Sequence, residues 1–397
     1  MKILIVCFWN MPLSGGIGTY IDNLQKGLEN EGHDVDIFGQ QLGVYGSYLL
    51  NGEPLLPKYK IRDVVNKEVH RFFVKHQPHL PVNVRILEAQ RYSFEFAATL
   101  LDLGKYDVIH CQDVISARLL SRINVQKRPI VTTIHGCLTF EMEHGGVFAN
   151  KLPSLRQYYV GIERLGISAG DQVIVPTRWL HGLLSRHFVS LNNSHIIPYG
   201  IDRERFLRQM NAPTQLTSDR RYTIVCPARL DPVKGHTVLF DALVKLKQQR
   251  TDWVCLLLGK GPLRPKLEAL CRRLQLEQHV LFLGNRRDVP ALMKQADIVV
   301  LPSLQDNQPF AVMEAQLAGK PLAVSNAGGI PEMVHHGHTG LVSAVNESVP
   351  LYKNLLTLLN DSSLRERLGN EGNAWANDQW PLQKMVQRTL AVYEQTS

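Results

Sequence analysis

Short apolar segments alternate with amphipathic helical segments along the whole chain, and this alternation constrains the fold more than any other feature. Runs such as 254–258 are apolar at every position rather than at every second one. A strand of this kind must be buried on both faces, as in a parallel sheet covered by helices. Because the alternation occurs in both halves, the sequence predicts an α/β protein of two doubly wound, Rossmann-like domains.

The expected strands follow from the apolar runs. They lie at 2–9, 33–39, 106–112, 128–135, 170–176 and 194–199 in the first half, and at 222–228, 252–258, 279–284, 296–302, 321–326 and 340–345 in the second. The segment 17–31 carries an apolar stripe at helical spacing, and Gly32 is expected to end that helix.

The domain boundary is expected in the polar segment 200–222, which lacks strand character and suits a linker. At roughly 100–200 residues per domain, a chain of 397 residues predicts two domains. We expect an N-terminal domain at 1–202, a C-terminal domain at 203–377, and a helical segment at 378–397 that packs back on the first domain.

Residues 40–95 interrupt the alternation and carry an excess of positive charge. Between 58 and 91, eight Lys and Arg residues stand against three acids. Apolar residues of this segment share one helical face: Ile61, Val64, Val65, Val69, Phe72 and Phe73. We favour a solvated basic helix packed on the domain by its apolar side. The alternative is that 58–76 contacts an anionic membrane surface or an acidic acceptor.

Composition excludes several classes of protein. Lys and Arg number 44 and Asp and Glu 36, so the net charge of +8 favours an anionic ligand. No nucleic-acid-binding motif accompanies this charge, and we expect no nucleic-acid partner.

No apolar run is long enough for a transmembrane helix, and residues 1–9 are interpreted as a buried strand rather than a signal peptide. The six cysteines lack metal-site spacing. We therefore expect a cytoplasmic protein with reduced thiols, with peripheral contact at the inner membrane face as an option.

A glycine-rich loop, 14–19, follows the first strand and opens the first helix. Glycines there let the backbone approach a phosphate or a sugar, and the helix N-terminus favours an anion. The spacing is not G-x-G-x-x-G, and the second strand ends without an acid that could bind a ribose. A nicotinamide cofactor is therefore disfavoured.

Polar residues at the ends of the third and fourth strands are the other candidates in the first half. His110 to Asp113 and His135 should lie at the carboxyl edge of the sheet, where open α/β folds bind ligands. By contrast, Asp34-Val35-Asp36 resembles a metal-binding DxD motif but lies at the start of a strand, on the other edge. We interpret it as structural and expect no catalytic metal.

The second half places charged residues in comparable loops. Arg229 and Lys234 lie between a strand and a helix and could face one anion, or they are two surface cations beside a turn. Gly259 ends the next strand and permits close backbone approach. Asp306 lies in a later loop and Glu314 in the helix after it, among mostly apolar neighbours.

Taken in order, these stretches resemble the retaining, nucleotide-sugar-dependent glycosyltransferases of the GT-B fold, known as glycosyl transferases group one or family four. The resemblance covers nearly the whole chain. The stretches that carry it are 15–18, 135–136, 197–202, 228–235, 259–262, 301–303, 306–314, 319–321 and 328–332. It implies two domains facing a central cleft, with the donor bound by the C-terminal domain.

The resemblance also implies roles for single residues. Arg229 and Lys234 would neutralise the donor diphosphate, and Glu314 would accept hydrogen bonds from the ribose. Asp306 would bind sugar hydroxyls; it stands where the family more often has Glu, which leaves the hexose open. The implied catalytic residues are His135, Arg229, Lys234 and Asp306; the implied donor-binding residues are Gly15, Gly16, Arg229, Lys234, Gly259, Asp306, Asn307, Gln308, Pro309, Phe310 and Glu314. Asp113 is the candidate for acceptor binding.

The implied reaction moves a hexosyl unit from a nucleoside-diphosphate sugar, by default a UDP-sugar, to a hydroxyl acceptor. The resemblance implies retention by front-face attack. No nucleophilic carboxylate is evident in the sequence, and two cations could stabilise the leaving diphosphate without metal. A GT-B phosphorylase, a sugar synthase and a non-catalytic nucleotide-sugar-binding protein are the alternatives. The acceptor is left open by the sequence.

Overall fold

The computed structural model describes residues 1–11, 15–41, 43, 46–78, 80–144, 148, 153–188, 191–214 and 222–396. Within it the chain forms two compact units. The N-terminal unit comprises Met1–Pro198 together with Gln383–Ser397, and the C-terminal unit comprises Tyr199–Leu382. Ser14 of the glycine-rich loop and part of the expected linker lie outside the described residues.

The N-terminal unit is built on one sheet with the strand order β4-β3-β2-β1-β5-β6-β7-β8. Its strands are β1 Lys2–Asn10, β2 Asp34–Gln40, β3 Ser47–Leu50, β4 Glu53–Pro57, β5 Val108–Cys111, β6 Ile130–Thr133, β7 Gln172–Val175 and β8 Ser194–Ile196. Its helices are α1 Gly16–Asn30, α2 Tyr59–His76, α3 Val82–Ala98, α4 Val114–Ile123, α5 Leu138–His144, α6 Pro153–Ile167, α7 Arg178–His187 and α15 Leu382–Glu394, with a 3-10 turn η1 Leu103–Lys105. The sheet is parallel except at β3 and β4.

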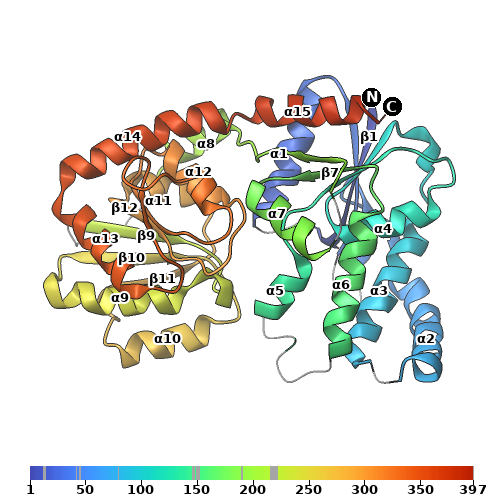
Figure 1. The fold of residues 1–397 in the computed structure, drawn as a ribbon, viewed down its shortest axis with the longest axis horizontal. Helices are drawn as coiled ribbons and strands as arrows, with labels where there is room; N and C mark the ends of the chain where they lie inside the picture. Colours follow the sequence, from blue (N-terminus) through green and yellow to red (C-terminus); the bar gives the residue numbers. More distant parts are fainter. Residues whose placement is uncertain are drawn as a thin grey trace. The chain divides into compact units, whose positions relative to one another are not determined.

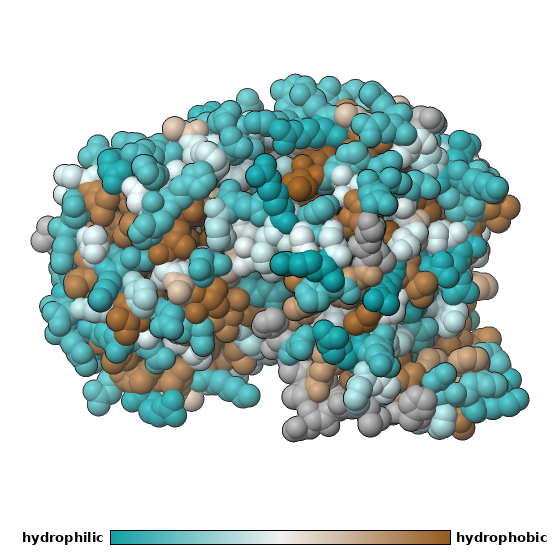
Figure 2. Space-filling model, in the orientation of Figure 1, coloured by the Kyte–Doolittle hydropathy of each residue, from teal (hydrophilic) through white to brown (hydrophobic). Residues whose placement is uncertain are grey.

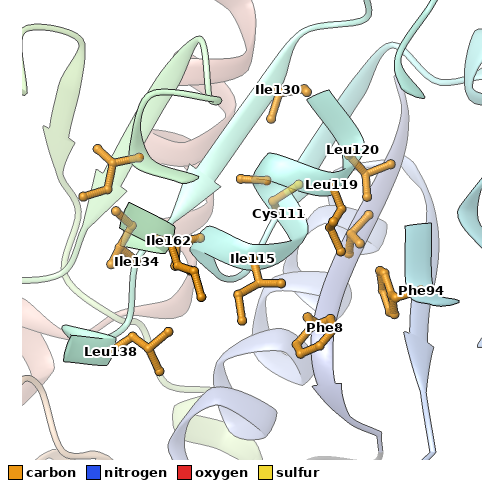
Figure 3. Packing of buried hydrophobic residues seen from close by; sticks show 14 of the residues in the cluster. Phe8, Phe94, Cys111, Ile115, Leu119, Leu120, Ile130, Ile134, Leu138 and Ile162 are labelled. Atoms are coloured by element: carbon orange, nitrogen blue, oxygen red, sulfur yellow. The ribbon is translucent and has the colours of Figure 1, made fainter. Parts of the chain in front are cut away.

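Both faces of this sheet are covered, as the continuous apolar runs predicted. Leu4 of β1 and Cys111 of β5 belong to a core that includes Ile115 and Leu119 of α4 (Figure 3). Ile3 is equally buried, and it points to the opposite face because successive strand residues alternate. Helices α2, α3, α4 and α6 lie side by side along the unit (Figure 1).

The C-terminal unit has a parallel sheet with the order β11-β10-β9-β12-β13-β14. Its strands are β9 Tyr222–Pro227, β10 Trp253–Leu258, β11 Val280–Gly284, β12 Ile298–Leu301, β13 Leu322–Ser325 and β14 Leu341–Ser343. Its helices are α8 Arg203–Met210, α9 His236–Gln249, α10 Arg264–Arg273, α11 Val289–Gln295, α12 Phe310–Leu317, α13 Ser348–Asn360 and α14 Ser362–Gln379, with 3-10 turns η2 Pro232–Lys234 and η3 Ile330–Glu332. Helices α9, α10 and α13 lie on one side of the sheet, and α8, α11, α12 and α14 lie on the other (Figure 1). The predicted α/β class with two doubly wound sheets is therefore confirmed.

The first helix ends as the sequence predicted. Tyr20, Leu24 and Leu28 are buried along one stripe of α1. Gly32 follows in a left-handed conformation with a φ of 82°. The amide of His33 donates to the Leu28 carbonyl at 3.1 Å, which satisfies a carbonyl of the last turn.

Two expectations about local structure were wrong. The supposed linker 200–222 contains α8, whose first turn is capped by the Asp202 carboxylate accepting from the Arg205 amide at 2.9 Å. The apolar face expected on the basic segment is divided: Val69 and Phe73 are buried, whereas Val64 and Phe72 are 68% and 54% exposed. The helix was placed correctly, but it packs through a narrower stripe than its composition suggested.

The hairpin β3–β4 was missed by sequence reasoning. Its two strands pair antiparallel around Asn51-Gly52, and both turn residues have positive φ, at 53° and 84°. Asn-Gly between apolar residues is a strong signal for a two-residue hairpin turn. That dipeptide was the clue that could have revealed the hairpin.

None of the helices in the described ranges combines the length and the apolar character needed to cross a membrane. All six cysteines are buried and free.

Candidate active site

The C-terminal sheet changes direction at β9, and this change fixes where a ligand can bind. From β9 the chain moves outward through β10 and β11, and it then returns to place β12 on the other side of β9. The loops after β9 and β12 therefore leave the same edge of the sheet from neighbouring strands. In doubly wound folds this is the position of the ligand crevice.

Two predicted site residues, one from each loop, meet at this edge. Lys234 Nζ donates to Asp306 Oδ2 at 2.6 Å, and the side chains are 18% and 12% exposed. The Ser303 hydroxyl donates to the same carboxylate oxygen at 3.0 Å. The structure thus places a cation and a carboxylate, 72 residues apart in sequence, in one half-buried ion pair at the edge of the sheet.

Glycines allow the loops that carry this pair to touch through their backbones. A Cβ atom at Gly235 would lie 1.9 Å from the Pro302 carbonyl oxygen, and one at Gly328 would lie 1.8 Å from that of Asp306. Both glycines also have positive φ, at 68° and 56°. The predicted residue Gly259 is similar, since a Cβ there would lie 2.1 Å from the Ala228 oxygen. These side chains must be absent for the loops to pack, which gives each glycine a structural role.

Backbone hydrogen bonds then lock the loops together. The Leu304 amide donates to the Val233 carbonyl at 2.8 Å, and the Gly329 amide donates to the Asp306 carbonyl at 3.1 Å. Asp306 is therefore held through its side chain by the loop after β9 and through its backbone by the loop after β13. Such support fixes the carboxylate before any ligand arrives.

Arg229 is less constrained than Lys234. It leaves the end of β9 and forms an ion pair with Asp231, with 3.1 Å between Nη2 and Oδ2. Its side chain is 63% exposed. The structure therefore joins Lys234 to Asp306, whereas the ion pair of Arg229 is formed within its own loop.

The residues before α12 hold a neighbouring segment in place. The Gln308 side-chain oxygen accepts from the Tyr199 amide at 2.7 Å, and the Phe310 ring stacks on the Tyr199 ring with centroids 5.4 Å apart. Asn307 is also buried, and Pro309 occupies the cap position of the helix. Sequence reasoning assigned 307–310 to the donor and missed Tyr199 as their partner.

Glu314 lies in the second turn of α12 between buried Met313 and buried Ala315. Burial raises the pKa of its carboxyl group to about 7. A carboxyl group with this pKa gains and loses its proton near neutral pH, so its capacity to accept hydrogen bonds changes in that range. His236, at the start of α9, is neutral by contrast, because burial and the charge of Lys234 lower its pKa to about 4.

The N-terminal sheet changes direction in the same way at β1, which lies between β2 and β5. Gly15 precedes α1 with a φ of 101°, and both Gly15 and Gly16 are exposed. The glycine-rich loop therefore opens a helix at the carboxyl edge of a central strand, as predicted. A helix start of this kind favours anions.

His135 follows β6 at the same edge. Its Nε2 lies 3.1 Å from the Gln112 side-chain oxygen, and its ring packs edge-on against Tyr20 with centroids 4.8 Å apart. Burial lowers the pKa of His135 to about 3, so the ring is neutral near pH 7. A neutral imidazole here can donate or accept a hydrogen bond but does not supply positive charge.

Asp113 has a structural role that the sequence did not reveal. It caps α4, since its Oδ1 accepts from the Ser116 amide at 2.7 Å and its Oδ2 accepts from the Phe8 amide at 2.8 Å. Both carboxylate oxygens are thus used by the backbone. A role for Asp113 in acceptor binding stays a prediction.

His110 was predicted near the ligand edge but is fully buried. Its Nδ1 lies 2.6 Å from the Tyr393 hydroxyl of α15, and its Nε2 lies 2.7 Å from the Thr133 hydroxyl. The Tyr20 hydroxyl lies 3.4 Å from the same Thr133 oxygen. A buried polar network therefore ties the last helix to the N-terminal sheet.

Tyr393→Phe is expected to destabilise the N-terminal unit by about 1–3 kcal/mol, because it leaves a buried ring nitrogen of His110 without its partner. Hydrogen exchange at the β5 and β6 amides should become faster. Tyr59→Phe is the control, since Tyr59 is 57% exposed. Equal exchange in the two variants would show that the network adds nothing to stability.

The carboxylates of the DxD-like motif are engaged at the other edge of the sheet. Asp34 forms an ion pair with Lys2 at 2.6 Å, and Asp36 accepts from the Tyr106 hydroxyl and from the Asn51 amide, both at 2.7 Å. The structural interpretation of this motif is confirmed. Among the described residues, no group of three or more His, Cys, Asp or Glu side chains is arranged to hold a metal ion.

Comparison with known proteins shows that each half of the chain matches a known family. Residues 14–205 match the family described as Glycosyltransferase Family 4, and residues 209–375 match Glycosyl transferases group 1. The chain is 24% identical to the MMP alpha-(1->4)-mannosyltransferase of Mycolicibacterium hassiacum, over 99% of this chain and 98% of that one. It is 25% identical to the UDP-Gal:alpha-D-GlcNAc-diphosphoundecaprenol alpha-1,3-galactosyltransferase of Escherichia coli, over 91% and 89%.

Solved structures agree on the fold. The crystal structure of Anabaena HepE in complex with UDP superimposes with a TM-score of 0.70 and 20% identity, and the match covers 100% of each chain. The two family matches meet near residue 207 and leave little of the chain uncovered. The protein is therefore a GT-B glycosyltransferase of the group 1 type, with a family 4 N-terminal half.

Proposed function

We propose that the protein transfers a hexosyl unit from a nucleoside-diphosphate sugar to a hydroxyl acceptor, with retention of configuration and without a metal ion. The observation that carries the proposal is the half-buried pair of Lys234 and Asp306 at the point where the C-terminal sheet changes direction. A diphosphate and a sugar need a cation and a hydrogen-bond acceptor side by side. This pair supplies both.

Lys234 has the central role in the proposed chemistry. Its ammonium would stabilise the negative charge that develops on the departing diphosphate, and Arg229 would reach the same diphosphate from solvent. Asp306 would accept hydrogen bonds from the sugar hydroxyls. Charge-assisted hydrogen bonds contribute about 1.5–3 kcal/mol each, so two or three of them would lower the barrier by several kcal/mol.

The other donor contacts follow from the resemblance. The donor would be held by backbone amides of 307–310 and by the loop after β10, where Gly259 permits close approach of the backbone. Glu314 would accept hydrogen bonds from the ribose hydroxyls. In the N-terminal unit, Gly15 and Gly16 would approach phosphate, and neutral His135 would offer a hydrogen bond to the sugar. Asp113 is proposed as the acceptor-binding residue of the N-terminal unit.

We take the nucleotide to be UDP. HepE was crystallised with UDP, and the Escherichia coli relative is named for a UDP-galactose donor. Retention by front-face attack rests on the family resemblance: the donor phosphate would accept the proton of the acceptor hydroxyl as the glycosidic bond to the diphosphate breaks.

The experiment that tests this function measures release of nucleoside diphosphate with and without candidate acceptors. A glycosyltransferase releases it in step with acceptor glycosylation, and NMR of the product gives the anomeric configuration. Phosphate-dependent release would identify a phosphorylase instead, and binding without any turnover would indicate a non-catalytic protein.

Donor binding should depend on pH through Glu314. A carboxylate accepts ribose hydrogen bonds better than a carboxylic acid, so binding favours the deprotonated form. With a pKa of about 7 in the free protein, UDP-glucose should bind about ten-fold more weakly at pH 6 than at pH 8. Calorimetry with a sugar nucleotide is the measurement, because the terminal phosphate of free UDP itself titrates near pH 6.

Glu314→Gln provides the control for that experiment. The amide cannot ionise, so the variant should bind more weakly but with an affinity that is flat between those pH values. His135 and His236, with pKa values of about 3 and 4, do not titrate in this range. If the affinity of the wild-type protein is equally independent of pH, Glu314 does not bind the ribose.

A further inference from the structure

A carboxylate lies completely buried at the start of α5 in the N-terminal unit. It belongs to Glu163 of α6, and none of its surface is exposed to solvent. The neighbouring residue Ile162 is part of the same core as Ile134 and Leu138 (Figure 3). A charge in such a place costs free energy unless hydrogen bonds replace the lost water. The hydrogen bonds of Glu163 therefore indicate what the buried charge does.

Both carboxylate oxygens of Glu163 accept hydrogen bonds from the residues that begin α5. Oε1 accepts from the Leu138 amide at 2.7 Å, and Oε2 accepts from the Thr139 amide at 3.0 Å. The Cys137 thiol donates to Oε2 at 3.5 Å. Each of these partners is a donor, so the arrangement fits the ionised carboxylate, although burial raises the pKa of Glu163. Amides of a first helical turn have no partner within their own helix, and Glu163 therefore acts as the cap of α5.

The neighbouring helices are capped in a simpler way. Helices α4 and α7 follow β5 and β7, and each is capped by the residue directly before it, Asp113 for α4 and Thr177 for α7. Helix α5 follows β6, but the residue before it is Cys137, which is not among the side chains that cap helices well. Its cap is Glu163, 25 residues after Leu138. The start of α5 is thus fixed by tertiary structure and not by its own sequence.

This remote cap bears on His135 because the loop between them is very short. Only two residues stand between His135 and α5. Before the loop, the Ile134 amide donates to the Ile174 carbonyl at 2.9 Å, so the segment is held at both ends. The loop is also closely packed, since a Cβ atom at Gly136 would clash with the Glu141 carboxylate of α5. A shift of the start of α5 would therefore move His135.

We propose that Glu163 is a positioning residue for the transfer reaction and acts by holding the loop that carries His135. Its carboxylate touches no substrate, because it is fully buried and both of its oxygens bind the start of α5. Glu163 fixes the backbone after His135, while Gln112 lies 3.1 Å from the ring nitrogen Nε2. The neutral imidazole is thus held in one orientation before a ligand arrives. The inference rests on the proposed function, in which His135 offers a hydrogen bond to the sugar.

The experiment is a double-mutant cycle in the full chain. Its members are the wild type, Glu163→Gln, His135→Ala and the variant that carries both substitutions. Glu163→Gln keeps the size of the side chain but removes its charge, and its NH2 group would face backbone amides that are themselves donors. Glu68→Gln is the matched control, because it removes the same charge from a side chain of α2 that is 58% exposed. Many hydrophilic residues face solvent in this part of the surface (Figure 2).

The probes are UDP-glucose, UDP-galactose and UDP-N-acetylglucosamine. The readout is the rate of UDP release from the probe that the wild type cleaves fastest. We expect His135→Ala and Glu163→Gln each to lower kcat at least about ten-fold, because the hydrogen bond to the sugar is lost in one and misplaced in the other. The affinity for UDP should change by less than about two-fold, since Arg229 and Lys234 belong to the C-terminal unit. The control Glu68→Gln should change kcat by less than about two-fold.

The cycle distinguishes positioning from a general loss of stability. A substitution that only unfolds part of the protein lowers the amount of active enzyme by the same factor whether or not the His135 ring is present. A substitution that acts through His135 has no further effect once that ring is removed. We therefore expect Glu163→Gln to lower kcat by less than about two-fold in the His135→Ala background.

Glu163→Asp is the second variant, and it takes the place of Glu163→Gln in the cycle if that protein does not fold. It keeps the carboxylate but shortens its reach, so its loss of kcat should be smaller and should depend on His135 in the same way.

An unchanged kcat in Glu163→Gln, or equal losses with and without the His135 ring, would overturn the proposal and leave the proposed function standing. An unchanged kcat in His135→Ala would instead remove His135 from the proposed function, and the role of Glu163 would fall with it. If the wild type releases UDP from none of the probes, the proposed function itself is contradicted, and this inference fails for that reason.

Discussion

Lys234→Ala is expected to abolish sugar transfer, with a loss of at least about 10³-fold in rate. The ammonium that should stabilise the departing diphosphate disappears, and one such stabilising group typically contributes 10²–10³-fold. The half-buried carboxylate of Asp306, 2.6 Å away, also loses its cation and would repel an incoming phosphate. UDP and UDP-sugar should both bind at least about ten-fold more weakly. Steady-state kinetics and calorimetry are the measurements.

Two further variants distinguish the effect of losing the Lys234–Asp306 ion pair from the effect of losing any positive charge. Lys260→Ala removes an exposed lysine of the neighbouring loop and should leave transfer nearly unchanged. Asp306→Asn should weaken UDP-sugar binding but not UDP binding, because it removes the sugar contact and frees Lys234 from its present partner. Unchanged turnover in Lys234→Ala would refute the assigned phosphate role.

Gly328→Ala is expected to reduce transfer at least about 100-fold without touching a charged residue. The new Cβ atom would lie 1.8 Å from the Asp306 carbonyl oxygen, and backbone atoms cannot rotate away as a side chain could. The Asp306 segment must therefore move, and a displacement of about 1 Å in a catalytic site costs about that factor.

Gly319→Ala is a matched control for this substitution. Gly319 also has a positive φ, at 66°, but nothing lies within 4 Å of the position where a Cβ atom would stand. Both variants carry the strain of a left-handed alanine, about 1–2 kcal/mol. Only Gly328→Ala carries the clash. Equal activity in the two variants would mean that the position of Asp306 does not control the reaction.

The sequence predicted the sheets well because their signal is local. A run such as β10, Trp253–Leu258, is short and apolar at every position, which favours a strand buried on both faces. The β3–β4 hairpin escaped because its strands are short and lie at the sheet edge. Its burial pattern is therefore weak, and only Asn51-Gly52 marks it.

The sequence identified single residues of the candidate site but not which of them contact one another. Lys234 and Asp306 were each identified, but their contact depends on β12 returning to the side of β9, which no local pattern encodes. The partner of His110 is more distant still, since Tyr393 lies 283 residues away. The capping role of Asp113 was missed because a residue at a strand end is also a residue at a helix start, where a carboxylate caps amides.

The central claim is that the loops after β9 and β12 bind the diphosphate of a sugar nucleotide through Lys234. The most direct test is thermal unfolding of the wild-type protein and of Lys234→Ala with a panel of nucleoside diphosphates and their sugars. A true ligand at 100 times its dissociation constant stabilises the wild type by about 2.7 kcal/mol, and at the same concentration a ligand that binds at least ten-fold more weakly should stabilise the variant by about 1.4 kcal/mol or less. No shift with any nucleotide, or the same shift in both proteins, would contradict the account.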